Sequence, residues 1–197
     1  GQGQTLSIVG GNTPFNKTIQ DDPLIEQLVP SGVTITGGTL SAPGGQINLV
    51  SVASPGEMLV PSFHTGLNID GASVTTMGTV TIKESATLDV SGQLGVGADG
   101  TPIGGNSGTV FVRGGQLVMD SSTIRANTVG AVDGARRAVD IHMSQDVALS
   151  NGTLISVATS GLGRAGDVMI EAGNVHLDGA STLIITGASG PGHGGDV

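Results

Sequence analysis

A short valine motif that recurs at nearly constant spacing constrains the fold of this chain more than any other feature. The pattern Val-x-(Ile/Val) begins at four valines, and the last residue stands where a fifth copy would begin: Val80, Val110, Val139, Val168 and Val197. The steps between these residues are 30, 29, 29 and 29 residues long. Such spacing predicts a solenoid, in which each repeat is one structural unit that stacks on its neighbours.

Two further apolar segments follow each valine motif. The second segments are Leu88–Val90, Leu117–Met119, Val147–Leu149 and Val175–Leu177, and the third are Ser122–Ile124, Gly152–Ile155 and Ser181–Ile185. Apolar and polar residues alternate in them, which predicts strands with one buried face, and helical spacing is not sustained. Polar outer positions favour a bare β-helix over a sheet covered by helices. We therefore predict an all-β fold, a right-handed parallel β-helix of about six to seven coils with three short strands per coil.

The composition agrees with a folded chain that has an aliphatic core. Aromatic residues make up 2% and charged residues 12% of the sequence, while the apolar fraction of 37% is too high for a disordered glycine-rich chain. A net charge of −9 with seven basic residues argues against nucleic acid and anionic membrane surfaces as partners. No apolar run reaches the roughly 18 residues of a membrane span, so no membrane insertion is expected. The chain contains no cysteine, which excludes disulfides and thiolate metal sites.

The regularity of the repeat predicts a single domain over residues 1–197. Residues 1–79 form less regular coils with insertions at 21–30 and 54–64, and residues 80–197 form regular coils of 29–30 residues with a loop at 92–108. Solenoids place variable function in such loops. A specific binding surface is therefore expected in the first part or on the 92–108 loop.

Stacking also predicts which outward side chains are neighbours. Residues three positions after the repeat valines form a charged row, which is Lys83, Arg113, His142 and Glu171. This row could hold an anion or a sugar carboxylate, and the alternative is a solvated ladder of charges. The row one position after the valines is Thr81, Phe111, Asp140 and Met169, in which Phe111 either anchors a partner or is covered by the 92–108 loop.

Other motifs offer weaker candidates for chemistry. Asp21 and Asp22 form an adjacent acidic pair, but Pro23 follows them and a turn explains the pattern. The four histidines stand at unrelated positions of the repeat, so no metal site is expected from them. Gly97–Gly100 and Gly192–Asp196 share letters with calcium-binding nonapeptides but lack the tandem spacing of that motif. We predict no catalytic residue and no cofactor, with calcium at a corner as the alternative.

Two stretches resemble the filamentous-haemagglutinin-like exoproteins of bacterial two-partner secretion systems. They are Gly3–Gly11, with the sequence GQTLSIVGG, and Gly37–Ala53, with the sequence GGTLSAPGGQINLVSVA. The resemblance implies a right-handed β-helix that is exported through an outer-membrane pore partner. It also implies a secreted or cell-surface location in a Gram-negative-type bacterium, and adhesion or display of a distal module.

These observations lead to one expected function and two alternatives. We expect a structural and adhesive shaft without enzymatic activity, whose receptor or glycan is not identified by the sequence. The first alternative is a subunit of an extracellular filament, in which neighbouring copies stack end to end because open coil ends expose strand edges. The second alternative is a polysaccharide-active β-helix enzyme, which would need several carboxylates converging on one outer face.

Overall fold

The computed structural model describes residues 5–11, 32–54 and 76–197, and within 5–11 it describes the backbone alone. Strands and turns make up the described residues, and no helix occurs among them. The described part of the chain consequently has no helix that could cross a membrane. The prediction of an all-β fold is confirmed for these residues.

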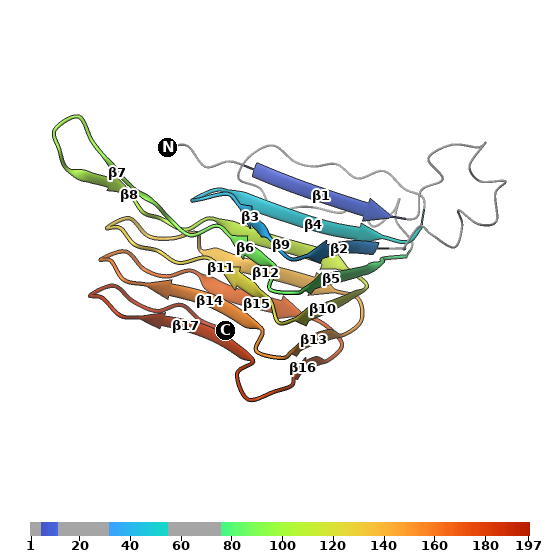
Figure 1. Ribbon diagram of the computed structural model, residues 1–197. Coiled ribbons are helices and arrows are strands. Elements are labelled where there is room, and N and C mark those ends of the chain that lie inside the picture. The colour runs from blue at the N-terminus through green and yellow to red at the C-terminus, as the bar shows by residue number, and fades with distance from the viewer. Residues whose placement is uncertain (1–4, 12–31, 55–75) are drawn as a thin grey trace, which may run out of the picture.

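Three parallel sheets of five strands each form the body of the molecule (Figure 1). Sheet A has the order β1 (Thr5–Gly11), β4 (Gln46–Val52), β9 (Thr109–Gly114), β12 (Arg137–Met143) and β15 (Asp167–Glu171). Sheet B has the order β2 (Gly32–Thr36), β5 (Thr79–Lys83), β10 (Gln116–Asp120), β13 (Val147–Ser150) and β16 (Val175–Leu177). Sheet C has the order β3 (Thr39–Ser41), β6 (Thr87–Asp89), β11 (Thr123–Arg125), β14 (Leu154–Thr159) and β17 (Leu183–Ala188).

The chain visits sheets B, C and A in that order and then begins again one strand further along each sheet. We call one such set of three strands a layer, for example β10, β11 and β12. Equivalent strands of neighbouring layers pair in parallel, as β9, β12 and β15 do. This stacked arrangement of parallel strands is compatible with a solenoid.

The predicted register is right for the later repeats and wrong for the first. Val110, Val139 and Val168 lie opposite one another in sheet A. Val80, however, lies in sheet B opposite Leu117. The residue of the preceding layer that faces Val110 is Ile47 of β4. The error arises because inward aliphatic residues alternate in the same way in all three sheets, so the motif does not identify the sheet.

The second segments show the same mixture of right and wrong assignments. Leu117, Val147 and Val175 share a row of sheet B as predicted. Leu88 belongs instead to sheet C, where it faces Ile124. The third segments pair as expected, since β11, β14 and β17 are neighbours in sheet C.

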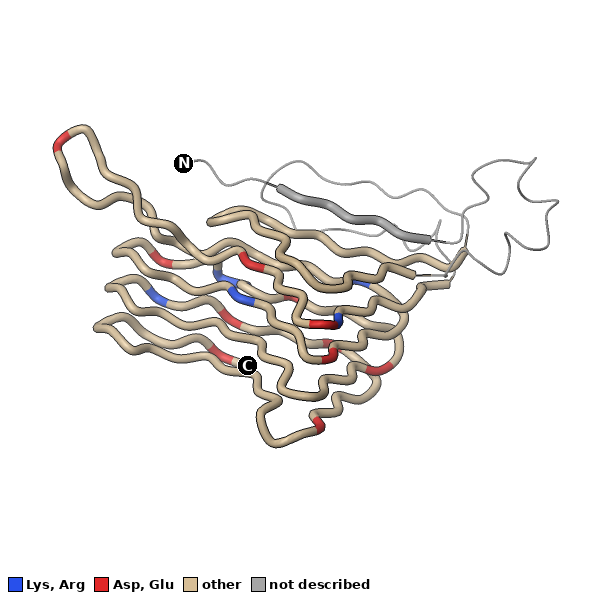
Figure 2. The backbone as a smooth tube through the Cα atoms, in the orientation of Figure 1, with Lys and Arg blue, Asp and Glu red and all other residues tan. Residues whose placement is uncertain are grey.

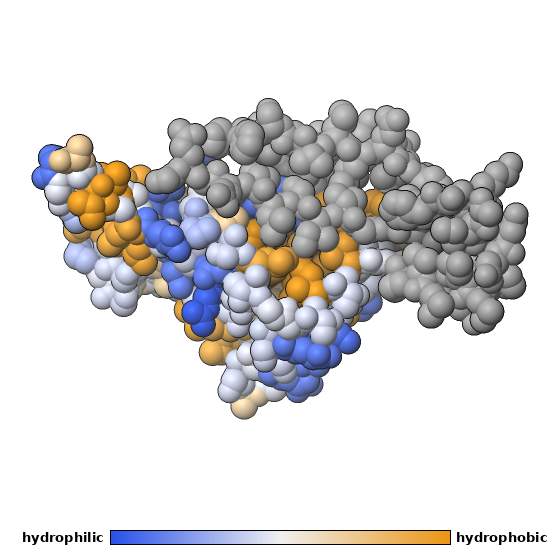
Figure 3. All heavy atoms as spheres, turned by 45° about the horizontal axis from the view of Figure 1, so that its top comes forward, coloured by the Kyte–Doolittle hydropathy of each residue, from blue (hydrophilic) through white to orange (hydrophobic). Residues whose placement is uncertain are grey.

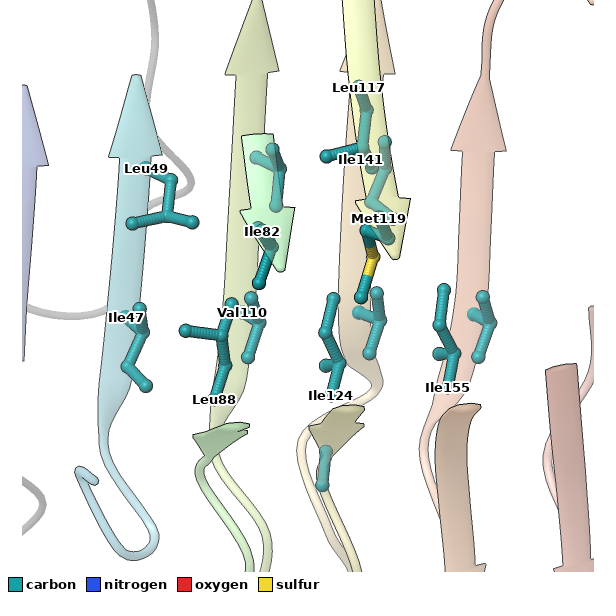
Figure 4. Close-up of a cluster of buried hydrophobic side chains, with 14 of the residues drawn as sticks. Ile47, Leu49, Ile82, Leu88, Val110, Leu117, Met119, Ile124, Ile141 and Ile155 are labelled. Atoms are coloured by element: carbon teal, nitrogen blue, oxygen red, sulfur yellow. The ribbon is translucent and has the colours of Figure 1, made fainter. Parts of the chain in front are cut away.

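The inward rows of the three sheets meet in one aliphatic core that runs along the stack (Figure 4). In sheet B, the row of Ile82, Met119 and Leu149 is completely or almost completely buried. Burial of one such side chain contributes about 1.5–3 kcal/mol. The adjacent layers, which cover these inward side chains, therefore stabilise each layer.

Glycines at the corner between sheets C and A let neighbouring layers approach closely. A Cβ added to Gly161 or Gly190 would lie 2.1 Å or 2.3 Å from a carbonyl oxygen of the layer before, and one added to Gly130 would lie 2.1 Å from the carbonyl oxygen of Gly104. No side chain fits at these distances. At the corner between sheets B and C, by contrast, Ser121 and Asn151 hold left-handed turns with φ of 48° and 53°, and Asn151 and Gly152 form a turn.

Of the three predicted insertions, one can be followed in the structure. The insertion at 21–30, together with residues 55–64 of the second, lies outside the described residues. The predicted loop at 92–108 contains an antiparallel hairpin of β7 (Leu94–Val96) and β8 (Pro102–Gly104). The hairpin projects from the corner between sheets C and A, away from the body of the molecule (Figure 1).

Candidate functional site

The outward face of sheet A carries charged side chains that form ion pairs with one another. Arg113, His142 and Glu171 lie opposite one another on β9, β12 and β15, so this part of the predicted charged row is confirmed. Lys83 is not in the row. It lies on β5 in sheet B opposite Thr36, and its amine is 3.7 Å from the carboxylate of the adjacent Glu84. Its inclusion followed from the wrong sheet assignment of Val80.

Asp140 is the centre of this face, and its side chain is only 3% exposed. Its Oδ1 lies 2.9 Å from Nη2 of Arg113 and 3.1 Å from Nε2 of His142. These two contacts are ion-pair distances without hydrogen-bond alignment. Its Oδ2 accepts a hydrogen bond of 3.2 Å from Nη1 of Arg137. On the far side of the imidazole, Nδ1 of His142 lies 2.9 Å from Oε2 of Glu171. We call these five residues the sheet A charge network.

Arg113 is the buried cation of the network. Its Nη1 donates to the carbonyl oxygens of Val112 at 3.0 Å and of Asp140 at 2.7 Å. Burial lowers the pKa of Arg113, while the carboxylate of Asp140 opposes that shift. A guanidinium nevertheless stays charged at neutral pH. Arg113 is thus a buried cation whose guanidinium interacts with protein oxygens in place of water.

Phe111 is buried, although its side chain is on the outward side of the sheet. It lies opposite Asn48 of β4 and Asp140 of β12. The guanidinium carbon of Arg113 lies 5.4 Å from the centre of its ring, a cation–π distance. The β7–β8 hairpin projects away from the body (Figure 1), and the covering of Phe111 by the rest of the 92–108 loop stays a prediction.

The charges of the network balance internally. Two arginines face two carboxylates, so with a neutral imidazole the cluster carries no net charge. Arg137, His142 and Glu171 are its solvent-accessible members, and a ligand would have to bind through them. The buried members, Arg113 and Asp140, join β9 to β12, and the exposed Glu171 extends the network to β15. Binding of an anion or sugar carboxylate here stays a prediction.

Arg137 was not singled out from the sequence, and the backbone explains why. The pairing of β12 with β15 shifts between Arg137 and Val139, where a β-bulge interrupts the register. The bulge lets Arg137 reach Asp140, three residues away, although strict alternation puts such residues on opposite faces. Bulges of this kind leave no clear mark in a sequence.

A second ion cluster, also missed in the sequence, lies at the corner between sheets C and A. Nη2 of Arg164 is 2.7 Å from Oδ1 of Asp167 and 3.6 Å from Oδ2 of Asp196. The hydrogen bond to Asp167 raises the pKa of Arg164. Burial alone would raise the pKa of Asp167, but hydrogen bonds from the Asp196 amide and from Arg164 outweigh it, and the net pKa is lowered. The available signal was the spacing of Asp167 and Asp196 by one repeat.

The remaining motifs do not converge on a metal site in the described residues, where no three His, Asp or Glu side chains are grouped to hold an ion. At the hairpin tip, Oδ1 of Asp99 accepts hydrogen bonds from the hydroxyl of Thr101 at 2.6 Å and from its amide at 3.1 Å. These bonds lower the pKa of Asp99. The acidic pair at 21–22 lies outside the described residues.

Comparison with protein-family models, with curated proteins and with solved structures finds no match to this chain. The assignment of function therefore depends on the strand order, the core and the surface residues described above.

Proposed function

We propose that this chain is a segment of a right-handed parallel β-helix that serves as a secreted or cell-surface structural and adhesive shaft. The observation that carries the proposal is the repeated B–C–A strand order, with inward rows that continue from layer to layer. In such a stack each layer adds about 4.8 Å of length, the spacing of paired strands. Repetition therefore yields a rod whose length is independent of any single site.

The sheet A charge network supports this role. Its contacts connect three consecutive strands of one sheet, from β9 through β12 to β15. Such a network resists sliding of layers past one another, because a shift would leave buried Arg113 and Asp140 without partners. As in the haemagglutinin-like exoproteins that two stretches resemble, export would use an outer-membrane pore partner. Adhesion would use a surface receptor or glycan.

The rod architecture can be tested by adding layers. Residues 169–197 are duplicated three times after Val197, which keeps the 29-residue register of sheet A. A solenoid should lengthen by about 15 Å, because three layers are added at the strand spacing. Small-angle X-ray scattering measures the maximum dimension. The urea midpoint should rise as well, because Val175 and Leu177 become covered. A control insert with Asp at the positions equivalent to these two residues should produce neither effect.

Adhesion is tested separately with the labelled protein on host epithelial cells and on a panel of neutral and acidic glycans. Saturable binding that is lost when residues 93–104 are replaced by a short turn would support an adhesive surface on the hairpin. A chain that elongates in the first experiment yet binds nothing in the second is a shaft without adhesive function, which would contradict half of the proposal.

End-to-end assembly into a filament is a second candidate, and one observation favours it. Val175 and Leu177 continue the inward rows of sheet B but are 42% and 48% exposed, because no described residue stacks on β16. Exposed inward rows beside open strand edges can pair with another molecule. Electron microscopy at high protein concentration would show filaments in that case, whereas discrete short particles would exclude it.

A further inference from the structure

The β7–β8 hairpin has an unusually apolar surface for a segment that projects into solvent. Leu94, Val96 and Ile103 are 54%, 76% and 49% exposed. The hairpin carries one charged residue, the acidic Asp99 at its tip (Figure 2). In the space-filling view, hydrophobic surface covers much of it (Figure 3). Concentrated apolar surface of this kind is typical of interaction sites.

The hydrogen bonds of the hairpin leave one row of backbone groups facing outward. Bonds from Gly97 N to Thr101 O and from Gly105 N to Gln93 O fix the alternation of the ladder. In an antiparallel pair, bonded and non-bonded pairs alternate, so Gly95 and Ile103 form the bonded pair between these two. The N–H and C=O groups of Leu94 and Val96 therefore point away from β8.

The two edges of the hairpin differ in how they are protected. On β8, Pro102 has no N–H to offer, and the carbonyl oxygen of Gly104 lies so close to Gly130 that a Cβ there would be 2.1 Å from it. On β7, the sequence Leu-Gly-Val contains neither proline nor charge. Natural proteins usually protect strand edges with such residues. The edge of β7 is thus open to another strand.

We propose that β7 pairs with β7 of a second copy of this chain, in antiparallel orientation around a two-fold axis at Gly95. Leu94 then lies opposite Val96 of the second copy, and the reverse holds by symmetry. Their outward N–H and C=O groups form four hydrogen bonds, while the two Gly95 residues face each other as a non-bonded pair. The product is a four-stranded sheet with β8 on both outer edges.

The side chains and charges fit this pairing. Leu94 and Val96 project to the same face of β7, so the two copies place four aliphatic side chains together. On the opposite face, Ile103 leans over Gly95, where an added Cβ would lie 3.5 Å from its side chain. Because each chain carries a net charge of −9, two copies repel over most of their surface. The hairpin, with its single charge, lets them approach with the least repulsion.

Disulfide trapping tests the proposed geometry directly. The chain has no cysteine, so a disulfide in the Gly95→Cys variant can only join two copies through residue 95. Non-bonded antiparallel pairs have Cα atoms about 4.5 Å apart, which suits a disulfide. In the matched Ala98→Cys variant, the two cysteines would be about 20 Å apart. We expect covalent dimer from Gly95→Cys and at most traces from Ala98→Cys. Equal cross-linking of both variants, or none of either, would overturn the proposal.

Sedimentation velocity tests the association without a cross-link. Three-residue strands make a small interface, so we expect a weak dimer that appears as concentration rises from micromolar to millimolar. Val96→Lys should abolish it, because a charge at this edge blocks strand pairing. Val132→Lys changes an apolar residue of comparable exposure outside the hairpin and should leave it intact. A monomer at every concentration, or equal loss in both variants, would contradict the pairing. Thermal unfolding monitored by circular dichroism verifies that both variants fold.

Discussion

Two neighbouring layers show how the same residue types at equivalent positions can differ in solvent exposure. Val147 and Leu149 of β13 are completely or almost completely buried, whereas Val175 and Leu177 of β16 are exposed to almost half of their surface. The two strands are adjacent in sheet B, and these residues lie opposite each other. The two strands therefore have the same alternating sequence pattern. The difference in exposure arises because another layer covers β13 and no described layer covers β16. In a stack of this kind, burial depends on the neighbouring layer.

The beginning of the described stack is more buried than its end. Val33 of β2 starts the same inward row of sheet B and is buried, and Ala42, which follows β3, is buried as well. Ile35 of β2 and Leu40 of β3 are partly buried. The two ends are thus unequal, since inward residues are buried or partly buried at the β2 end and exposed at the β16 end. Mutations that compare an inner layer with the β16 layer measure how much stability stacking provides.

The largest effect is expected from Asp140 in the inner layers, compared with the exposed Asp196 of the last corner. Asp140→Ala leaves the buried Arg113 without its counter-ion and should lower the free energy of unfolding by about 3–5 kcal/mol. Asp196→Ala should change it by less than about 0.5 kcal/mol, because exposed ion pairs contribute little. Urea unfolding monitored by circular dichroism suits this chain, which has no Trp or Tyr. Equal losses in both variants would mean that the sheet A charge network is not a stabilising cluster.

A slightly smaller loss of stability is expected from substituting the inward leucines of β13 and β16. Leu149→Ala creates a cavity between two covered layers and should cost about 2–5 kcal/mol. Leu177→Ala removes a side chain that already faces solvent over nearly half of its surface, so its cost should stay below about 1.5 kcal/mol. The same urea titration measures both. If the two costs agree within error, β16 is covered in solution, for example by another copy of the chain.

Two glycines test how closely the backbones of neighbouring layers approach each other. A Cβ on Gly161 would lie 2.1 Å from the carbonyl oxygen of Gly130, whereas a Cβ on Gly187 in β17 meets nothing within 4 Å. Gly161→Ala should therefore destabilise the protein by about 1–3 kcal/mol through overpacking. Gly187→Ala should be neutral or stabilise it by about 0.5 kcal/mol, since alanine restricts the unfolded chain. Thermal midpoints would distinguish these outcomes, and a tolerated Gly161→Ala would show that the corners are looser than described.

The smallest effect concerns acid stability at the corner between sheets C and A. The pKa of Asp167 is lowered in the folded state from 3.8. Its ionised form therefore stabilises the fold above about pH 4, and this contribution is lost as pH falls through the lower, folded pKa. Asp167→Asn should remove that part of the pH dependence and leave the rest unchanged. Unfolding curves between about pH 2 and 7 measure it. An unchanged acid limb would show that Asp167 does not take part.

The sequence predicted the features that recur and missed those that occur once. Alternation predicted strands, and one-repeat spacing brought together Arg113, His142 and Glu171 in sheet A. Val80 was misplaced because the β7–β8 hairpin lies between β6 and β9, so the 30 residues from Val80 to Val110 stay within one layer and do not span a full repeat. Identical aliphatic alternation in sheets A and B offered no correction.

The centre of the candidate site was harder to predict than its row. Asp140 stands in a neighbouring row of the same face, and Arg137 reaches it only because a β-bulge interrupts β12. Long charged side chains also cross between rows, which a register of Cα positions does not capture. The apolar hairpin was expected as a loop, but its strand pairing requires the turn at residues 97–100 to be known in three dimensions.

The open rows at β16 have a consequence for how the molecule folds and unfolds. In the later layers, strand contacts join residues about one repeat apart, as between Val110 and Val139, so each of these layers closes a loop of similar, modest size. Folding can then nucleate in any pair of stacked layers and propagate as further layers add to that pair. Unfolding under native conditions should begin with β16 and β17. Their amides would exchange with solvent first, and protection would increase layer by layer toward β9 and β10.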